Sequence, residues 1–131
     1  MEKLIPFTLT DLAKVTNHRS GEIKFGEKMH TLPKEMTPME FLKTCEAKYV
    51  LFGIPEDIGV RANYGRPGAA SAWESAIKSI ANIQHNRFCK GSRLLVLGAL
   101  DVKEEMEFVK ELDFTISEDR VKLSQTVEKI D

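Results

Sequence analysis

Two short runs of apolar residues set the pattern of this chain. The first run extends from Tyr49 to Ile54 and the second from Arg93 to Ala99. Neither run alternates apolar with polar residues, which is typical of a strand buried on both faces of a sheet. Pro55 ends the first run, because proline lacks the N–H group that a strand donates to its neighbour. The pattern therefore predicts two buried strands.

The segment between the two strands predicts a long loop and then a helix. Residues 56–67 are rich in glycine, and we expect a loop of twelve residues there. Residues 69–82 carry small or apolar side chains three or four positions apart, which predicts a helix with one apolar stripe. The stripe consists of Ala69, Ala72, Trp73, Ala76, Ile77 and Ile80. A helix between two strands lets them pair in parallel, with their carboxyl ends at one sheet edge. Since ligands bind at that edge, we expect the functional surface at the loop, and Asp101 should lie on the same edge just past the second strand.

Helix-start signals predict two further helices. Thr37 followed by Glu40 forms a capping box, and Pro38 suits the first helical position, so a helix is expected over residues 38–47. Its expected buried residues are Phe41, Leu42 and Cys45. Ser117 is expected to cap a last helix that ends near residue 130. The side chains expected to face inward from it are Val121, Leu123, Val127 and Ile130.

Two segments carry weaker patterns. In residues 1–36, Thr8 or Thr10 could cap a short helix that ends at Val15. Residues 104–116 fit alternation in part but are rich in helix-forming glutamate, so we expect a short helical turn and then an extended segment over residues 114–116.

These elements predict an α/β fold, a small parallel sheet flanked by helices. At 131 residues the chain is one domain at most. We expect residues 1–36 to be an N-terminal extension and residues 37–131 to form a partial α/β domain. We expect the sheet to have an unfinished edge, because all-parallel sheets are normally larger and covered on both faces.

Composition narrows the classes of function. The net charge of −1 argues against a general nucleic-acid binder, which needs a basic surplus. No apolar run approaches the roughly 20 residues that span a membrane. Cys45 and Cys89 are isolated in the sequence, which favours reduced thiols and a cytoplasmic protein.

The sequence offers little catalytic equipment. It contains no phosphate-binding loop, no nucleophile elbow and no His, Asp or Cys residues at metal-ligand spacing, so we expect no catalytic residue and no metal in this chain. The adjacent Glu56 and Asp57 are expected to be solvated. Arg61 and Arg66 could bind a carboxylate or phosphate, or could tie the loop to its own backbone or to a neighbouring subunit. With Asn63 they are the candidates for contact with a substrate or a subunit.

Residues 48–102 resemble the amino-terminal segment of the ureohydrolase family, which comprises arginases, agmatinases and formimidoylglutamases. The matching positions are Phe52 to Pro55, Asp57, Gly59, Val60, Asn63, Gly65 to Ala69, and Leu97 to Val102. Residues 82–86 are similar to the formimidoylglutamase-like branch in particular.

The resemblance implies the first part of a three-layer α/β/α arginase-like domain, with the strand at residues 93–99 outermost and the strand at residues 49–54 beside it. It also implies a homo-oligomeric parent enzyme that hydrolyses a guanidino or amidino C–N bond with two manganese ions. The family's metal-binding motifs do not occur in this sequence, so the chain is expected to be an inactive amino-terminal fragment.

The sequence also departs from the family pattern near the predicted helix. Ala72, Trp73 and Lys78 occur where most members have a Gly-Pro pair and an arginine. Two other functions therefore stay open. One is a small non-enzymatic α/β domain that binds a protein partner through the loop or its helix faces. The other is a nucleotide-binding half-fold, with a phosphate at the helix that begins after Gly68.

Overall fold

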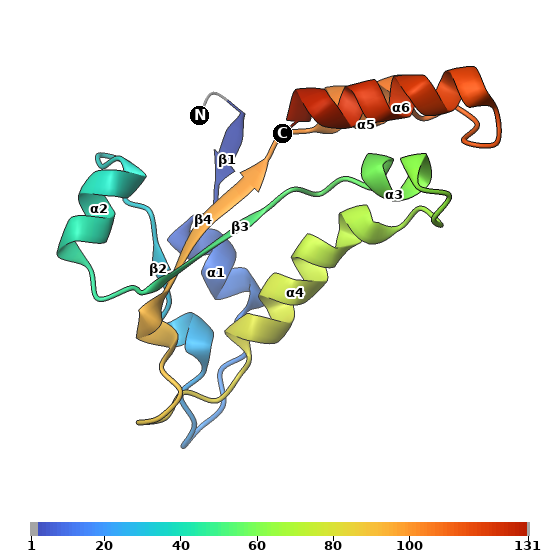
Figure 1. The fold of residues 1–131 in the computed structure, drawn as a ribbon. Coiled ribbons are helices and arrows are strands. Elements are labelled where there is room, and N and C mark those ends of the chain that lie inside the picture. Colours follow the sequence, from blue (N-terminus) through green and yellow to red (C-terminus); the bar gives the residue numbers. More distant parts are fainter. Residues whose placement is uncertain (1–2, 131) are drawn as a thin grey trace.

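The computed structural model of the chain describes residues 3–130, which form a small sheet flanked by helices (Figure 1). The strands of this part of the chain are β1 (Leu4–Pro6), β2 (His30–Thr31), β3 (Tyr49–Gly53) and β4 (Leu94–Leu100). Its α-helices are α1 (Leu9–Val15), α2 (Pro38–Thr44), α3 (Ile58–Ala62), α4 (Ala72–Ala81), α5 (Lys103–Phe108) and α6 (Ser117–Ile130). Short 3-10 turns cover Phe25–Glu27, Ala69–Ser71 and Gly91–Arg93. None of the helices within residues 3–130 combines the length and apolar character needed to cross a membrane.

Strand β4 lies at the centre of the sheet. It pairs in parallel with β3 along one edge, and its other edge is shared by β2 in parallel and β1 antiparallel. The two parallel strands predicted on either side of helix α4 are confirmed. The prediction that all strands are parallel is wrong, as is the expectation that β4 is outermost. The reason is that the N-terminal segment folds back along β4, where the Phe7 N–H donates to the Leu97 carbonyl at 3.0 Å and the Asp101 N–H to the Lys3 carbonyl at 2.7 Å.

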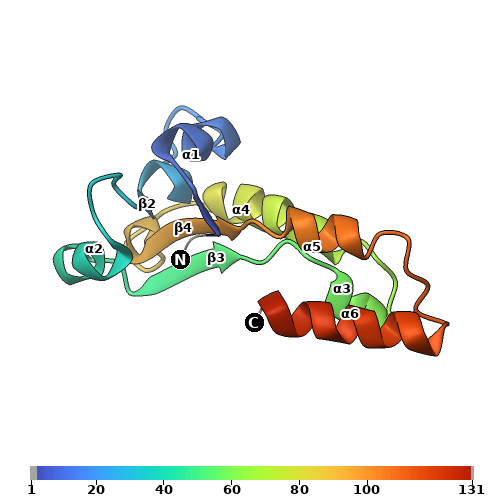
Figure 2. The same cartoon turned by 90° about the horizontal axis from the view of Figure 1, so that it is seen from above.

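The main core lies between the sheet and the helices α1 and α4, which Figure 2 shows on the same side of it. Its buried members are Leu12, Phe25, Met29, Ile77, Ala81 and Val96. Each of the members larger than alanine contributes about 1.5–3 kcal/mol when it is fully removed from water. Three of the members come from the first 36 residues, so this segment packs with α4 and β4 around one core.

A second core joins α6 to α3. Ile58, Val109 and Leu123 are each fully buried there. The predicted bounds of the last helix are confirmed, but Val121 was expected inside and is exposed, while Thr126 is buried and donates its hydroxyl to the Lys122 carbonyl at 2.8 Å.

The segment before α6 is a turn. The prediction of an extended segment at residues 114–116 is therefore wrong. The Asp113 carboxylate accepts hydrogen bonds from the backbone N–H of Thr115 at 2.8 Å and from its hydroxyl at 2.7 Å. An aspartate that bonds two residues ahead stabilises a turn in place of a strand.

The predicted starts of α1 and α2 are confirmed, whereas α4 begins at Ala72 after a 3-10 turn, and Ser117 is the first residue of α6 and not its cap. Thr37 and Glu40 form the capping box of α2, and of the two threonines proposed for α1 the structure uses Thr8, with Asp11 as its partner. Helix α2 is shorter than predicted and buries none of its residues, because it lies at one end of the sheet (Figure 1). Phe41 makes an edge-to-face contact with His30, with ring centroids 6.0 Å apart, and stays half-buried.

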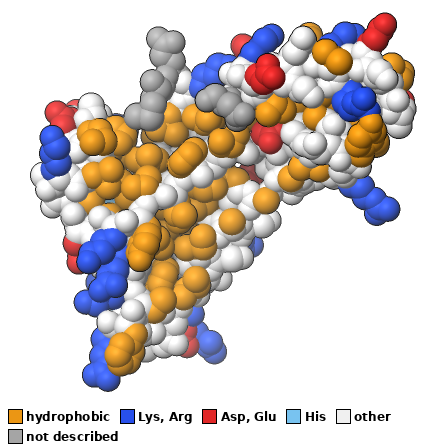
Figure 3. All heavy atoms as spheres, viewed as in Figure 1, with side chains coloured by type: hydrophobic (Ala, Val, Ile, Leu, Met, Phe, Trp, Pro, Cys, Tyr) orange, Lys and Arg blue, Asp and Glu red, His pale blue; other side chains and the backbone are white. Residues whose placement is uncertain are grey.

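One face of β3 is open. Val50 is 37% exposed, Phe52 54% and Ile54 43%, although the apolar run predicted a strand buried on both faces. Figure 3 shows apolar side chains gathered across the centre of this face. Within residues 3–130, β3 pairs only with β4 and its outer edge has no neighbouring strand. The composition of the run suits a buried strand, yet the described part of the chain leaves this face uncovered.

Candidate functional site

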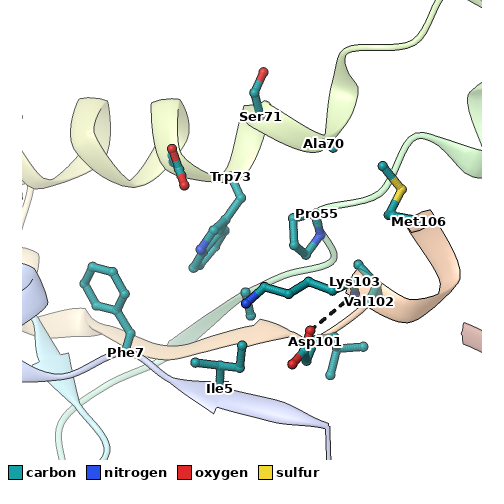
Figure 4. Close-up of a pocket in the computed structure, with 13 residues that line it drawn as sticks. Ile5, Phe7, Pro55, Ala70, Ser71, Trp73, Asp101, Val102, Lys103 and Met106 are labelled. Carbon is teal, nitrogen blue, oxygen red and sulfur yellow. Dashed lines mark hydrogen bonds between the residues drawn. The ribbon is translucent and has the colours of Figure 1, made fainter. Parts of the chain in front are cut away.

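A pocket of about 520 Å³ lies at the sheet edge where β3 and β4 end (Figure 4). Segments from five parts of the chain line it: β1 and the residues after it, the end of β3, the start of α4, the end of β4 and the start of α5. The lining residues are Ile5, Phe7, Pro55, Ala70, Ser71, Trp73, Glu74, Ala99, Leu100, Asp101, Val102, Lys103 and Met106. The pocket lies at the predicted sheet edge, which is where open α/β sheets bind ligands, but none of residues 56–67, the predicted functional loop, lines it. The volume is in the range of small-molecule sites.

The indole of Trp73 forms one wall of the pocket and packs directly on β3. A Cβ atom at Gly53 would overlap the indole ring, so only glycine at this strand position lets the ring lie there. Trp73 is half-buried: it packs against the main core and also borders the pocket. The apolar stripe predicted that Trp73 lies on the core-facing side of α4, and Trp73 does pack against the main core.

Asp101 and Lys103 bring opposite charges to the pocket. The Asp101 carboxylate accepts a hydrogen bond from the backbone N–H of Lys103 at 3.3 Å, at the start of α5. The Lys103 side chain extends across the pocket in the direction of Trp73 and Phe7 (Figure 4). Among the ion pairs formed within residues 3–130, none includes Lys103 or Asp101. Glu74 is the third charged residue of the lining.

The prediction of a twelve-residue loop over residues 56–67 is wrong, because part of this segment forms helix α3. The Glu56 carboxylate accepts from the Gly59 N–H at 3.0 Å, and the Asp57 carboxylate accepts from the Gly68 N–H at 2.7 Å. Asp57 is buried, so the prediction of two solvated carboxylates is also wrong. Ile58 provides the physical reason, since it draws the segment into the second core with α6.

The three candidate contact residues of this segment do not converge on one site. Arg61 donates to the backbone carbonyl of Leu112 at 2.6 Å and lines a separate hollow beside α5. Asn63 donates its side-chain N–H to the Gly59 carbonyl at 3.0 Å, at the end of its own helix. Arg66 is exposed, and neither Asn63 nor Arg66 lines either the pocket or that hollow.

Sequence reasoning missed the side of the pocket that β1 supplies. Ile5 and Phe7 carry no motif, and their place depends on β1 pairing with the end of β4. Lys103 also carries no motif and reaches the pocket from the start of α5. The signal in the sequence that could have located this pocket was Asp101, which was expected at this sheet edge because it follows the second apolar run.

An ion pair between Lys3 and Glu105 connects the start of β1 to α5 beside the pocket. The hydrogen bond from Lys3 lowers the pKa of Glu105, and the bond to Glu105 raises the pKa of Lys3. A lowered carboxylate pKa stabilises the fold above the unfolded-state value, and this contribution is lost as the pH falls through the folded-state value.

The variant Lys3→Met is therefore expected to lose less stability than the wild type when the pH falls from neutral to below about 4, the usual range of a glutamate. The free energy of unfolding, measured by urea denaturation at several pH values, checks this. Parallel pH curves for the two proteins would show that Lys3 does not lower the pKa of Glu105 in the folded state.

The described residues do not provide a manganese site. Between residues 3 and 130 no three His, Cys, Asp or Glu side chains lie close enough together to hold a metal ion. The site described here is thus a largely apolar pocket with three charged side chains at the carboxyl edge of a small mixed sheet. Comparisons of the chain with protein-family models, with curated proteins and with solved structures give no match.

Proposed function

We propose that this chain is the amino-terminal part of a ureohydrolase-like enzyme that hydrolyses a C–N bond in a guanidino or amidino compound. The segment that resembles the family, residues 48–102, folds as β3, α3, α4 and β4, and its strands end at the candidate site. The observation that carries the proposal is the open face and free edge of β3. A three-layer α/β/α domain would cover both.

The free edge of β3 can accept another strand. The Lys48 N–H donates to the Arg93 carbonyl at 2.8 Å, toward β4. Because backbone groups alternate in direction along a strand, those of Tyr49 and Leu51 point away from β4. Residues 49–54 contain no lysine or proline, the residues that commonly protect an edge from pairing. An added strand would satisfy these groups, and an added helix layer would cover Val50, Phe52 and Ile54.

The proposed parent is a cytoplasmic homo-oligomer that acts on a small amidine or guanidine with two manganese ions. The residues described here do not fit such a metal site, so the chain by itself is proposed to be inactive. Its part in the enzyme is to form the start of the sheet and to place the carboxyl edge beside the later strands.

The test is to express the complete open reading frame that encodes this chain and to assay it with Mn²⁺. Arginine, agmatine and N-formimidoylglutamate are suitable substrates, because C–N hydrolysis releases urea from the first two and formamide from the third. We expect one of these products from the complete protein and none from the chain alone. A complete, folded protein that hydrolyses none of the three contradicts the proposal.

The second candidate is a small non-enzymatic domain that binds a protein partner, which the same open face of β3 also favours. The two candidates differ in what covers that face. If the complete protein is the enzyme, its β3 amides exchange slowly with solvent in the absence of any partner. If the chain is an interaction domain, these amides exchange slowly only when the partner is bound.

The isolated chain is expected to self-associate through β3, because two free edges can pair and bury Val50, Phe52 and Ile54 together. Sedimentation over a range of concentrations should show dimers, and Phe52→Lys should make the chain monomeric. The matched control is Phe88→Lys, which replaces a phenylalanine that is 78% exposed outside the sheet. A wild-type chain that stays monomeric at high micromolar concentration would show that the edge does not pair.

A further inference from the structure

The charges in the pocket point to one class of small molecule, and this inference does not depend on the proposed function. We propose that the pocket binds an apolar α-amino acid or a similar zwitterion, with the ligand carboxylate at Lys103, its ammonium group at Asp101 and its apolar side chain against Trp73 and Phe7. The other charged groups that face the pocket or lie beside it are Glu74, Lys3, Glu104 and Glu105.

The Lys103 ammonium group is placed to bind a carboxylate. It has no carboxylate partner within residues 3–130, and its side chain extends into the pocket between Ile5 and Trp73 (Figure 4). Lys103 is exposed, so water partly screens an ion pair that it forms with a ligand, and such a pair orients the ligand more than it adds affinity. Lys103 is also the single cationic residue in the lining, so a ligand with several phosphate groups would lack partners.

Asp101 is placed to bind an ammonium group near the same point. It follows β4 directly and is half-buried, two residues before Lys103 in the sequence. One carboxylate oxygen accepts the Lys103 N–H, which fixes the orientation of the group at the start of α5 and leaves the second oxygen for a ligand. The pocket thus offers one carboxylate and one ammonium group for a zwitterion, in a lining that is otherwise largely apolar apart from Ser71 and Glu74.

The apolar walls fit a side chain of moderate size. Ile5 and Phe7 from β1 and the residue after it, Trp73 from α4 and Met106 from α5 line the space from three different segments. A pocket of about 520 Å³ is larger than a single amino acid, so the ligand has room to enter without a change in the fold. Removal of the apolar part of the ligand from water would supply most of the affinity, at about 25 cal/mol per Å².

Trp73, the one tryptophan of the chain, reports on binding through its fluorescence. Three probes share a phenyl body: phenylalanine has both charges, 3-phenylpropionate lacks the ammonium group and 2-phenylethylamine lacks the carboxylate. We expect a saturable change in Trp73 emission with phenylalanine, and binding about tenfold weaker for each of the other two, as expected for the loss of one charge-assisted hydrogen bond.

Variants of Lys103 and Asp101 test which charged group of the ligand each residue binds. Lys103→Gln should weaken phenylalanine binding about tenfold and leave that of 2-phenylethylamine unchanged, and Lys103→Arg should retain most of the affinity. Asp101→Asn keeps an oxygen that can accept the Lys103 N–H, and should weaken phenylalanine about tenfold but not 3-phenylpropionate. Glu74→Gln is the control for a second carboxylate in the lining, and Lys78→Gln is the control for an exposed lysine of α4. Both should bind phenylalanine as the wild type does.

Three results would overturn the proposal. The first is an absence of saturable change with phenylalanine at millimolar concentration. The second is equal binding of the three probes, which would show an apolar pocket without charge recognition. The third is a loss of affinity in Glu74→Gln with none in Asp101→Asn. Unliganded Trp73 emission and circular dichroism identical to those of the wild type show that each variant is folded.

Discussion

Replacing Gly98 with alanine is expected to lower the free energy of unfolding by about 4 kcal/mol or more. Gly98 has a φ of +138°, a conformation that residues with a side chain rarely adopt. A Cβ atom there would also overlap the carbonyl oxygen of Ile5 on β1. The variant thus combines backbone strain with a clash at the centre of the sheet, and β1 should separate from β4. Urea denaturation followed by circular dichroism measures the loss.

Gly68→Ala is the matched control. Gly68 has nearly the same φ, +131°, but a Cβ atom there would meet nothing within 4 Å. Gly68→Ala should lower the free energy of unfolding by the backbone strain alone, about 1–2 kcal/mol. The difference between the two variants measures the contact of β1 with β4. Equal losses in both would mean that β1 does not lie against Gly98 in solution.

Leu123→Ala is expected to lower the free energy of unfolding by about 3 kcal/mol, because it leaves a cavity in the second core. Leu123 is fully buried against Ile58 and Val109, and these contacts hold α6 on α3. The helical signal in circular dichroism should therefore be lost at a lower urea concentration than in the wild type.

Val121→Ala, two positions earlier on the same helix, is the control for this variant. Val121 is 55% exposed, so its truncation should change stability by no more than about 0.5 kcal/mol. The sequence pattern alone assigned both side chains to the core. Similar losses in the two variants would support that pattern and contradict the position of α6 in the structure.

The sequence determined the elements whose signals are local. The parallel strands β3 and β4, the helix α4 between them and the long helix α6 follow from apolar periodicity and from breaks such as Pro55. The capping box at Thr37 located the start of α2. The sequence also indicated the sheet edge that holds the pocket, because the carboxyl ends of parallel strands must lie together.

The tertiary structure decided the elements that are stable only through distant contacts. Strands β1 and β2 span three and two residues, too short for a periodic pattern, and exist because β4 offers them an edge. Helix α3 forms in a glycine-rich segment because Ile58 is buried under α6. The pairing of β1 with β4 brings Phe7 to the pocket that Trp73 and Lys103 also line.

The open face of β3 shows most clearly what composition leaves undetermined. Residues 49–54 have the apolar character of a fully buried strand, and the sequence determined that they form one. Which of their faces is covered depends on the elements that pack against them: the main core with α1 and α4 covers one face, and Val50, Phe52 and Ile54 stay exposed on the other. Hydrophobicity gives a residue a preference for burial, but burial itself requires a partner surface, and only the arrangement of elements in space provides that.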